Sequence, residues 1–182
     1  MEKLYYSLAA LALILLYSCS EDENQNFSFQ GHYEISQMTS DTSVDLNEDG
    51  IASTNLLNEI VPYYFENTVY DLEIRPHNYT ESDAKLILFS IPHQILLFDD
   101  PNDQNSSIDY CKKGFGTSYE FSDNKIQLEN FSNDFITIKN IEILSNDNIK
   151  TNIEKEYFDT ETENWVKLSI EIVYQKIDLE AL

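Results

Sequence analysis

Apolar and polar residues alternate along several stretches of this chain, most regularly near its C-terminal end. Over residues 166–175 the apolar positions of this pattern are Val166, Leu168, Ile170, Ile172 and Tyr174. The intervening residues are polar apart from Val173, and this period of two predicts a strand with one face buried. The same alternation predicts further strands over residues 70–75, 118–121, 126–129, 136–138 and 153–157.

Turn and bulge signals separate these predicted strands. Residues 122–125, Ser-Asp-Asn-Lys, lie between two alternating stretches and predict a tight hairpin. The apolar phase shifts by one residue within 136–143, which predicts a β-bulge near Asn140. Residues 86–89 and 95–98 are instead continuous apolar runs, as expected of strands buried on both faces or of a central hairpin.

One short helix is predicted near residues 53–61. Ser53 or Thr54 would cap its first turn, and Pro62 would end it. The residues that would face the core are Leu56, Leu57 and Ile60.

The number and spacing of these elements predict an all-β fold. About eight to ten strands joined by short hairpins favour an antiparallel up-and-down meander, and closing it into a barrel removes the exposed edges. A barrel of about eight strands can hold one small ligand. An open sandwich is the alternative architecture.

The N-terminal segment has the features of an export signal. Residues 4–16 are almost wholly apolar but too few to cross a bilayer as a helix. Leu16-Tyr17-Ser18-Cys19 resembles the lipobox of bacterial lipoproteins, which implies that residues 1–18 are a signal peptide and that Cys19 carries the lipid. The acidic run after Cys19 resembles a signal for the outer face of the outer membrane, with a solvated tether as the alternative. We therefore expect a lipid-anchored protein of the bacterial outer membrane that is exposed at the cell surface or faces the periplasm.

The remainder divides into a tether and one domain. Residues 19–30 are mostly polar and are expected to form a flexible acidic tether. Residues 31–182 have the length of a single domain. The chain carries a formal net charge of −22, which argues against nucleic acid as a partner and is compatible with cation binding. Only Cys111 remains besides Cys19, so no intramolecular disulfide is expected.

Three segments resemble lipocalin-like bacterial lipoproteins. Residues 31–33, Gly-His-Tyr, stand where that family carries Gly-x-Trp at the start of its first strand. Residues 44–50 and 53–59 are similar to a segment common in the family, and so is the ending over 165–167 and 173–177. The resemblance implies a calycin-type barrel on a lipid anchor.

The sharpest local motif is Asp45-x-Asn47-x-Asp49-Gly50. Oxygen ligands at alternate positions followed by glycine form the first half of an EF-hand-type calcium loop. The candidate calcium ligands are Asp45, Asn47, Asp49, the carbonyl of Ile51, and Ser53. The twelfth position is Leu56 rather than a bidentate acid, so a turn that caps the following helix is the alternative interpretation.

The sequence favours a binding protein over an enzyme. No nucleophile elbow or glycine-rich phosphate loop is present, and the three histidines share no metal-ligand spacing and are read as ordinary surface or strand-end residues. The first hypothesis is a barrel that holds a small apolar molecule, lined by Tyr70, Leu72, Ile74, Tyr119, Phe121, Ile170 and Ile172. The alternative is an inert barrel whose loops bind a protein or glycan, and a hydrolase comes third.

Overall fold

The computed structural model describes residues 28–60, 70–75, 85–96, 107–129, 131–145 and 147–178. These residues form nine strands and one short helix, α2 (Leu56–Glu59). The strands are β1 (Gly31–Val44), β2 (Ser53–Asn55), β3 (Leu72–Ile74), β4 (Leu86–Leu96), β5 (Ile108–Ser122), β6 (Lys125–Leu128), β7 (Thr137–Ser145), β8 (Asn148–Asp159) and β9 (Asn164–Ile177). In this part of the chain, no helix is long and apolar enough to span a membrane.

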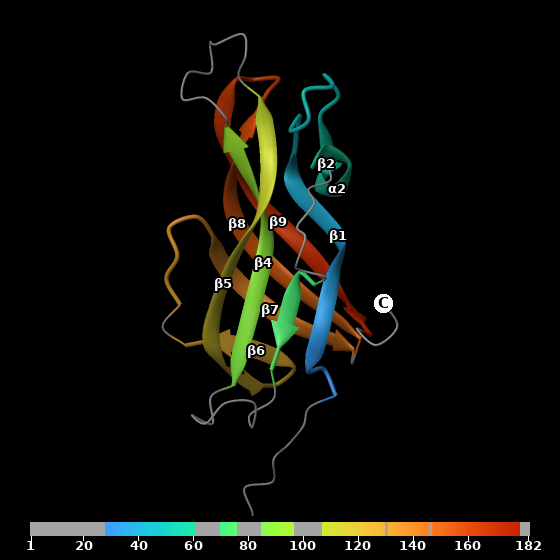
Figure 1. Ribbon diagram of the computed structural model, residues 1–182, viewed down its shortest axis with the longest axis vertical. Helices are drawn as coiled ribbons and strands as arrows, with labels where there is room; N and C mark the ends of the chain where they lie inside the picture. The colour runs from blue at the N-terminus through green and yellow to red at the C-terminus, as the bar shows by residue number, and fades with distance from the viewer. Residues whose placement is uncertain are drawn as a thin grey trace, which may run out of the picture.

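Eight of the strands close into an antiparallel barrel, as the alternating pattern predicted (Figure 1). The ring runs from β1 through β3 and then in chain order to β9, which returns to pair with β1 from His32↔Ile177 to Ser40↔Ile170. β2 pairs with β1 alone and lies beside the ring. From β3 to β9 each strand pairs with the next one in the chain, so the fold is the predicted up-and-down meander rather than a sandwich.

The ring is weakest between β6 and β7. These two strands share a single residue pair, Lys125↔Glu142, beside one further backbone bond from Ile143 N to Asn124 O at 2.8 Å. β5 pairs with β6 only over Tyr119–Ser122, so residues 108–118 of β5 and 137–141 of β7 have no strand on this side within the described chain. We call the opening between those two stretches the seam.

β4 is one continuous strand, which corrects the alternative of a central hairpin there. It pairs with β5 without a break from Leu86↔Ser118 to Leu96↔Ile108. Pro92 lies in its middle, where a proline normally breaks a sheet. The carbonyl of Pro92 accepts a 2.7 Å hydrogen bond from the Tyr157 hydroxyl on β8, so the missing N–H on the same edge leaves the β4–β5 bonds intact.

The inward faces of the strands pack into one hydrophobic core. On β9, every second residue from Leu168 to Tyr174 is at most 2% exposed, as the alternation predicted. The core also includes Phe29, which is 4% exposed, and the nearby Ser28 carbonyl accepts a 2.7 Å bond from Lys176 Nζ. Residues 28–30, assigned by sequence to the tether, therefore belong to the folded domain.

The predicted helix near residues 53–61 is shorter than expected. Residues 53–55 form β2, and α2 spans only Leu56–Glu59. Its cap is Asn55, whose side chain accepts from Leu57 N, rather than Ser53 or Thr54. Leu56 and Ile60 are buried as predicted, but Leu57 is exposed and Glu59 is buried instead. Glu59 takes this inward place because its carboxylate accepts the backbone N–H of Leu46 at 3.1 Å.

Candidate functional site

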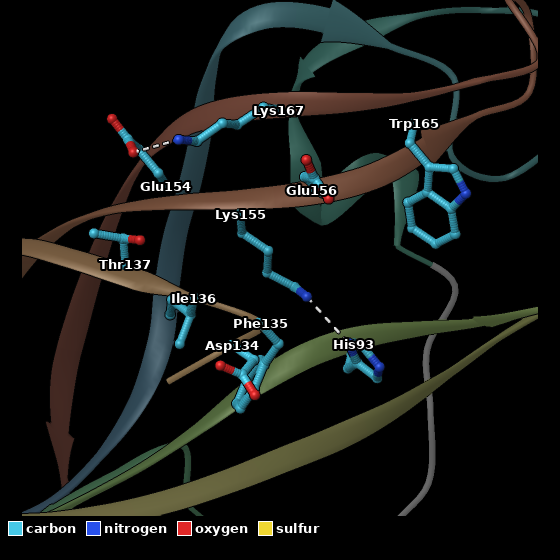
Figure 2. A pocket seen from close by; sticks show the side chains of 10 residues that line it. All are labelled: His93, Asp134, Phe135, Ile136, Thr137, Glu154, Lys155, Glu156, Trp165 and Lys167. Carbon is cyan, nitrogen blue, oxygen red and sulfur yellow. Dashed lines mark hydrogen bonds and ion pairs between the residues drawn. The ribbon is translucent and has the colours of Figure 1, made fainter. Parts of the chain in front are cut away.

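A pocket of about 360 Å³ lies between β4, the start of β7, β8 and β9 (Figure 2). It is lined by His93, Asp134, Phe135, Ile136, Thr137, Glu154, Lys155, Glu156, Trp165 and Lys167. Residues 134–136 immediately precede β7, where the seam leaves the barrel wall without a paired strand. The pocket is therefore located where the ring of strands is least complete.

Lys155 projects into this pocket from the inward face of β8. It alternates with Ile153 and Tyr157 and is only 3% exposed. Figure 2 shows its side chain crossing towards β4, where Nζ lies 3.1 Å from Nδ1 of His93. The ammonium also lies 4.7 Å from the centre of the Tyr157 ring and 5.6 Å from that of Phe135, within the range of a cation–π contact.

No carboxylate among the described residues forms an ion pair with Lys155. The other lysine in the pocket, Lys167, is paired with Glu154 at 2.8 Å. Asp134 and Glu156 line the pocket without reaching the Lys155 ammonium. Buried charges in proteins are normally paired, so an unpaired buried lysine is the unusual feature of this site.

Burial, together with the positive charge of Lys113, lowers the pKa of Lys155 to about 8. Burial, together with the charges of Lys155 and Lys113, lowers the pKa of His93 to about 4. At neutral pH the pair is therefore an ammonium beside a neutral imidazole. Nδ1 of His93 accepts from Lys155, so the ring proton is on Nε2.

Two contacts between β4 and β8 hold this pair in place. The Gln94 amide donates to Phe158 O at 3.0 Å and accepts from Phe158 N at 2.7 Å, so it pairs with a backbone edge as a strand would. The bond from the Tyr157 hydroxyl to Pro92 O lies two residues away from Gln94 on β4 and one residue away from Phe158 on β8. These contacts flank His93 on both sides along β4 and follow Lys155 on β8, so they hold the two strands together beside the pair.

The apolar wall of the pocket continues into the core through aromatic rings. Phe89 stacks on Phe115 with ring centres 5.0 Å apart, and Phe115 meets Phe135 edge to face at 5.8 Å. Phe135 in turn lies 5.9 Å from the His93 ring. Trp165, 54% exposed and supported by Phe158 at 5.8 Å, forms the outer rim. The pocket thus combines an aromatic wall with a buried cation.

The residues predicted to line a ligand lie elsewhere. Leu72, Ile74, Tyr119, Ile170 and Ile172 are at most 2% exposed within the core cluster, and Phe121 packs against it. The structure brings these six side chains together, but in the packed interior of the barrel rather than in the pocket. That they contact a ligand stays a prediction.

Tyr70, the seventh predicted lining residue, belongs to a polar group around Glu73. Its hydroxyl donates to Glu73 at 3.0 Å, and Arg75 donates to the same carboxylate at 2.7 Å. Burial opposes ionisation of Glu73, but these two hydrogen bonds lower its pKa. His32 completes the group with its ring 4.7 Å from that of Tyr70. This arrangement satisfies a buried acid on the outer face of β3.

The predicted calcium loop is a tightly hydrogen-bonded turn. The Asp45 carboxylate accepts the backbone N–H groups of Asn47, Glu48 and Gly50 at 3.3, 2.9 and 2.9 Å. Asp49 accepts from the Asn47 side chain at 3.2 Å. The oxygens of Asp45 and Asp49 thus accept hydrogen bonds from N–H groups of the loop itself, and these bonds stabilise the turn.

The outer calcium candidates also bond locally. Ile51 N donates to Asp49 at 2.8 Å, and the Ser53 hydroxyl accepts from Asn55 N at 3.0 Å. In the part of the chain that the structure describes, no group of three or more His, Cys, Asp or Glu side chains could hold a metal ion. Calcium binding at this loop stays a prediction.

Cys19, the predicted lipidation site, and the rest of residues 1–27 lie outside the described residues. Comparison with protein-family models, with curated proteins and with solved structures finds no match for this chain. The fold and the pocket are therefore interpreted from this chain's own residues.

Sequence reasoning missed the pocket, although one signal for it was present. Lys155 occupies an inward position of an alternating strand, between Ile153 and Tyr157, where an apolar residue is the norm. His93 was read as a surface or strand-end residue, but it lies within β4. Its partnership with Lys155 depends on the approach of β4 to β8, which no local pattern encodes.

Proposed function

We propose that this protein is a lipid-anchored, lipocalin-like binding protein that holds a small apolar ligand in the pocket beside the seam. The observation that carries the proposal is the pocket itself, with a volume of about 360 Å³ and walls that include Phe135, Ile136 and Trp165. Binding sites for small molecules are typically concave, largely apolar and supplied with a few fixed polar groups. Here Lys155 and His93 are the polar groups fixed beside the aromatic wall, and the lining also includes Asp134, Thr137, Glu154, Glu156 and Lys167.

The anchor and the location are part of the same proposal. The lipobox-like residues 16–19 support a lipid on Cys19, and the acidic run after it supports exposure on the outer membrane surface. The predicted tether ends at the folded domain, whose first described residue is Ser28. The tether would in this way hold a ligand-binding barrel close to the membrane.

The test uses the neutral fluorescent probe N-phenyl-1-naphthylamine. Trp165 is the only tryptophan of the chain and lines the pocket, so energy transfer from it reports a bound probe directly. The mature chain with Cys19→Ser needs no detergent. We expect saturable transfer that Thr137→Tyr, which fills the pocket, strongly reduces.

The matched control is Ser43→Tyr, which adds the same ring at an exposed position of β1 outside the pocket. It should bind the probe as the parent chain does. The proposal fails if the parent chain does not bind the probe, or if Thr137→Tyr and Ser43→Tyr bind it equally well.

A further inference from the structure

The Lys155 ammonium has more hydrogen-bonding capacity than the protein uses. It carries three N–H donors, and His93 Nδ1 accepts one of them. No other side chain or backbone acceptor in the described chain bonds to Nζ. Two N–H donors of the Lys155 ammonium, a side chain that is only 3% exposed, thus remain available to a ligand in the pocket.

The surroundings of the ammonium favour a negative partner. Lys113 places a second positive charge nearby, with its Nζ 4.2 Å from the centre of the Phe135 ring that forms the wall. Glu154 is shared between Lys167 and Lys139 at 2.8 and 3.0 Å, and Asp134 and Glu156, which also line the pocket, form no hydrogen bond or ion pair with the Lys155 ammonium. The positive charge near Phe135 comes from Lys155 and Lys113, and no bonded acid offsets it at the Lys155 ammonium in a chain of net charge −22.

The size and walls of the pocket restrict the rest of the partner. A volume of about 360 Å³ accommodates one or two fused rings or a short chain. Beyond the ammonium the apolar part of the wall is Phe135, Ile136 and Trp165, and the carboxylates of Asp134, Glu154 and Glu156 also line the pocket and would repel a second anionic group. One negative charge at one end of an apolar body fits these walls.

We propose, on the basis of the function proposed above, that the ligand is an aromatic or short-chain monocarboxylate whose carboxylate bonds Nζ of Lys155. The body of the ligand then lies between the rings of Phe135 and Trp165. The hydrogen bond from Lys155 to His93 keeps the ammonium oriented in the ligand-free protein, which lowers the cost of ordering it on binding.

A pair of nearly isosteric compounds tests the head group: 2-naphthoate and its neutral amide, 2-naphthamide, each displacing N-phenyl-1-naphthylamine from the mature Cys19→Ser chain at neutral pH. A charge-assisted hydrogen bond in a desolvated site should make naphthoate bind about tenfold or more tightly than naphthamide. Lys155→Met should abolish this preference while keeping the probe and the amide bound.

Lys150→Met is the matched control, because it removes the same charge from the same strand at a position outside the pocket, where the ammonium pairs with Glu142 and Glu171. It should keep the preference for naphthoate. Circular dichroism and retained probe binding establish that both variants are folded.

The outcomes separate the two proposals. Equal affinity of the parent chain for naphthoate and naphthamide, with the probe still bound, overturns the head-group inference and leaves the binding function standing. A preference for naphthoate that persists in Lys155→Met overturns it as well, since the anion then binds elsewhere. Absence of probe binding in the parent chain rejects the binding function itself.

Discussion

Lys155 reduces the stability of the protein that contains it. Its pKa falls from an ordinary value of 10.5 to about 8, mainly through burial. Between these two pH values the unfolded chain binds more protons than the folded one, so this residue makes stability rise with pH across that window. Below pH 8 its full penalty, about 3 kcal/mol, is present.

Lys155→Met should therefore stabilise the ligand-free protein by up to about 3 kcal/mol at pH 7. The difference from the parent chain should shrink as the pH rises from 8 to 10.5 and above, because the folded lysine is then already neutral and the unfolded one loses its proton over this range. Urea unfolding of both chains at several pH values measures this. The other ionisable groups near the ammonium are His93, Lys113, Cys111, Asp134 and Glu156, and the comparison cancels their shared contribution. A pH-independent difference would show that burial of Lys155 is not its cause.

The loop 45–50 is the predicted calcium site. If the loop 45–50 binds the ion, millimolar calcium should raise the melting temperature of the mature Cys19→Ser chain relative to chelator, because the ion binds only the folded state. Asp49→Ala should remove the shift. Identical melting curves in calcium and in chelator would leave the loop as a turn whose Asp45 oxygens serve the backbone.

At the scale of elements, alternation sets which face of each strand is buried. Ile170 is 2% exposed, whereas the neighbouring Glu171 side chain is 53% exposed and 3.7 Å from Lys150. Ile170→Asp buries an unpaired charge and should cost about 4 kcal/mol or more. Glu171→Lys loses only a surface ion pair and should cost less than about 1 kcal/mol. Equal losses in thermal melts would contradict the register of β9.

The elements that the sequence predicted well are those determined by residues within the element or its adjoining turn. The hairpin between β5 and β6 turns through Asp123 and Asn124, both with positive φ, as short polar turn residues permit. The bulge near Asn140 appears as a shift between Ile138 and Asn140. The helix near residues 53–61 was too long because Asn55, after β2, supplies the cap.

The pocket could not be predicted in the same way, because it depends on contacts between distant strands. Gln94 pairs with Phe158, 64 residues away, and this contact brings His93 to Lys155. The alternation of apolar and polar residues predicts that Lys155 points inward, but it does not predict which strand lies opposite. Alternation therefore identified the barrel and left its binding chemistry undetermined.

At the scale of the whole molecule, the prediction is that one thioether-linked lipid anchors the domain. Cys19→Ala should release the protein from the membrane fraction, because the acyl chains on that cysteine supply its hydrophobic attachment. Labelling with a clickable palmitate analogue should disappear in the same variant. Unchanged fractionation and labelling would show that Cys19 is not the anchor.

The single residue pair between β6 and β7 gives the barrel one line of low local stability. Amide hydrogens of β5 that face the seam lack a strand partner over residues 108–118, whereas β8 is paired on both sides. In hydrogen-exchange measurements these β5 amides should exchange by small openings, well before the amides of β8. Residues 131–136 would then separate from Phe115 while the other pairings stay intact. Local openings along the seam would thus widen the Lys155 pocket without global unfolding.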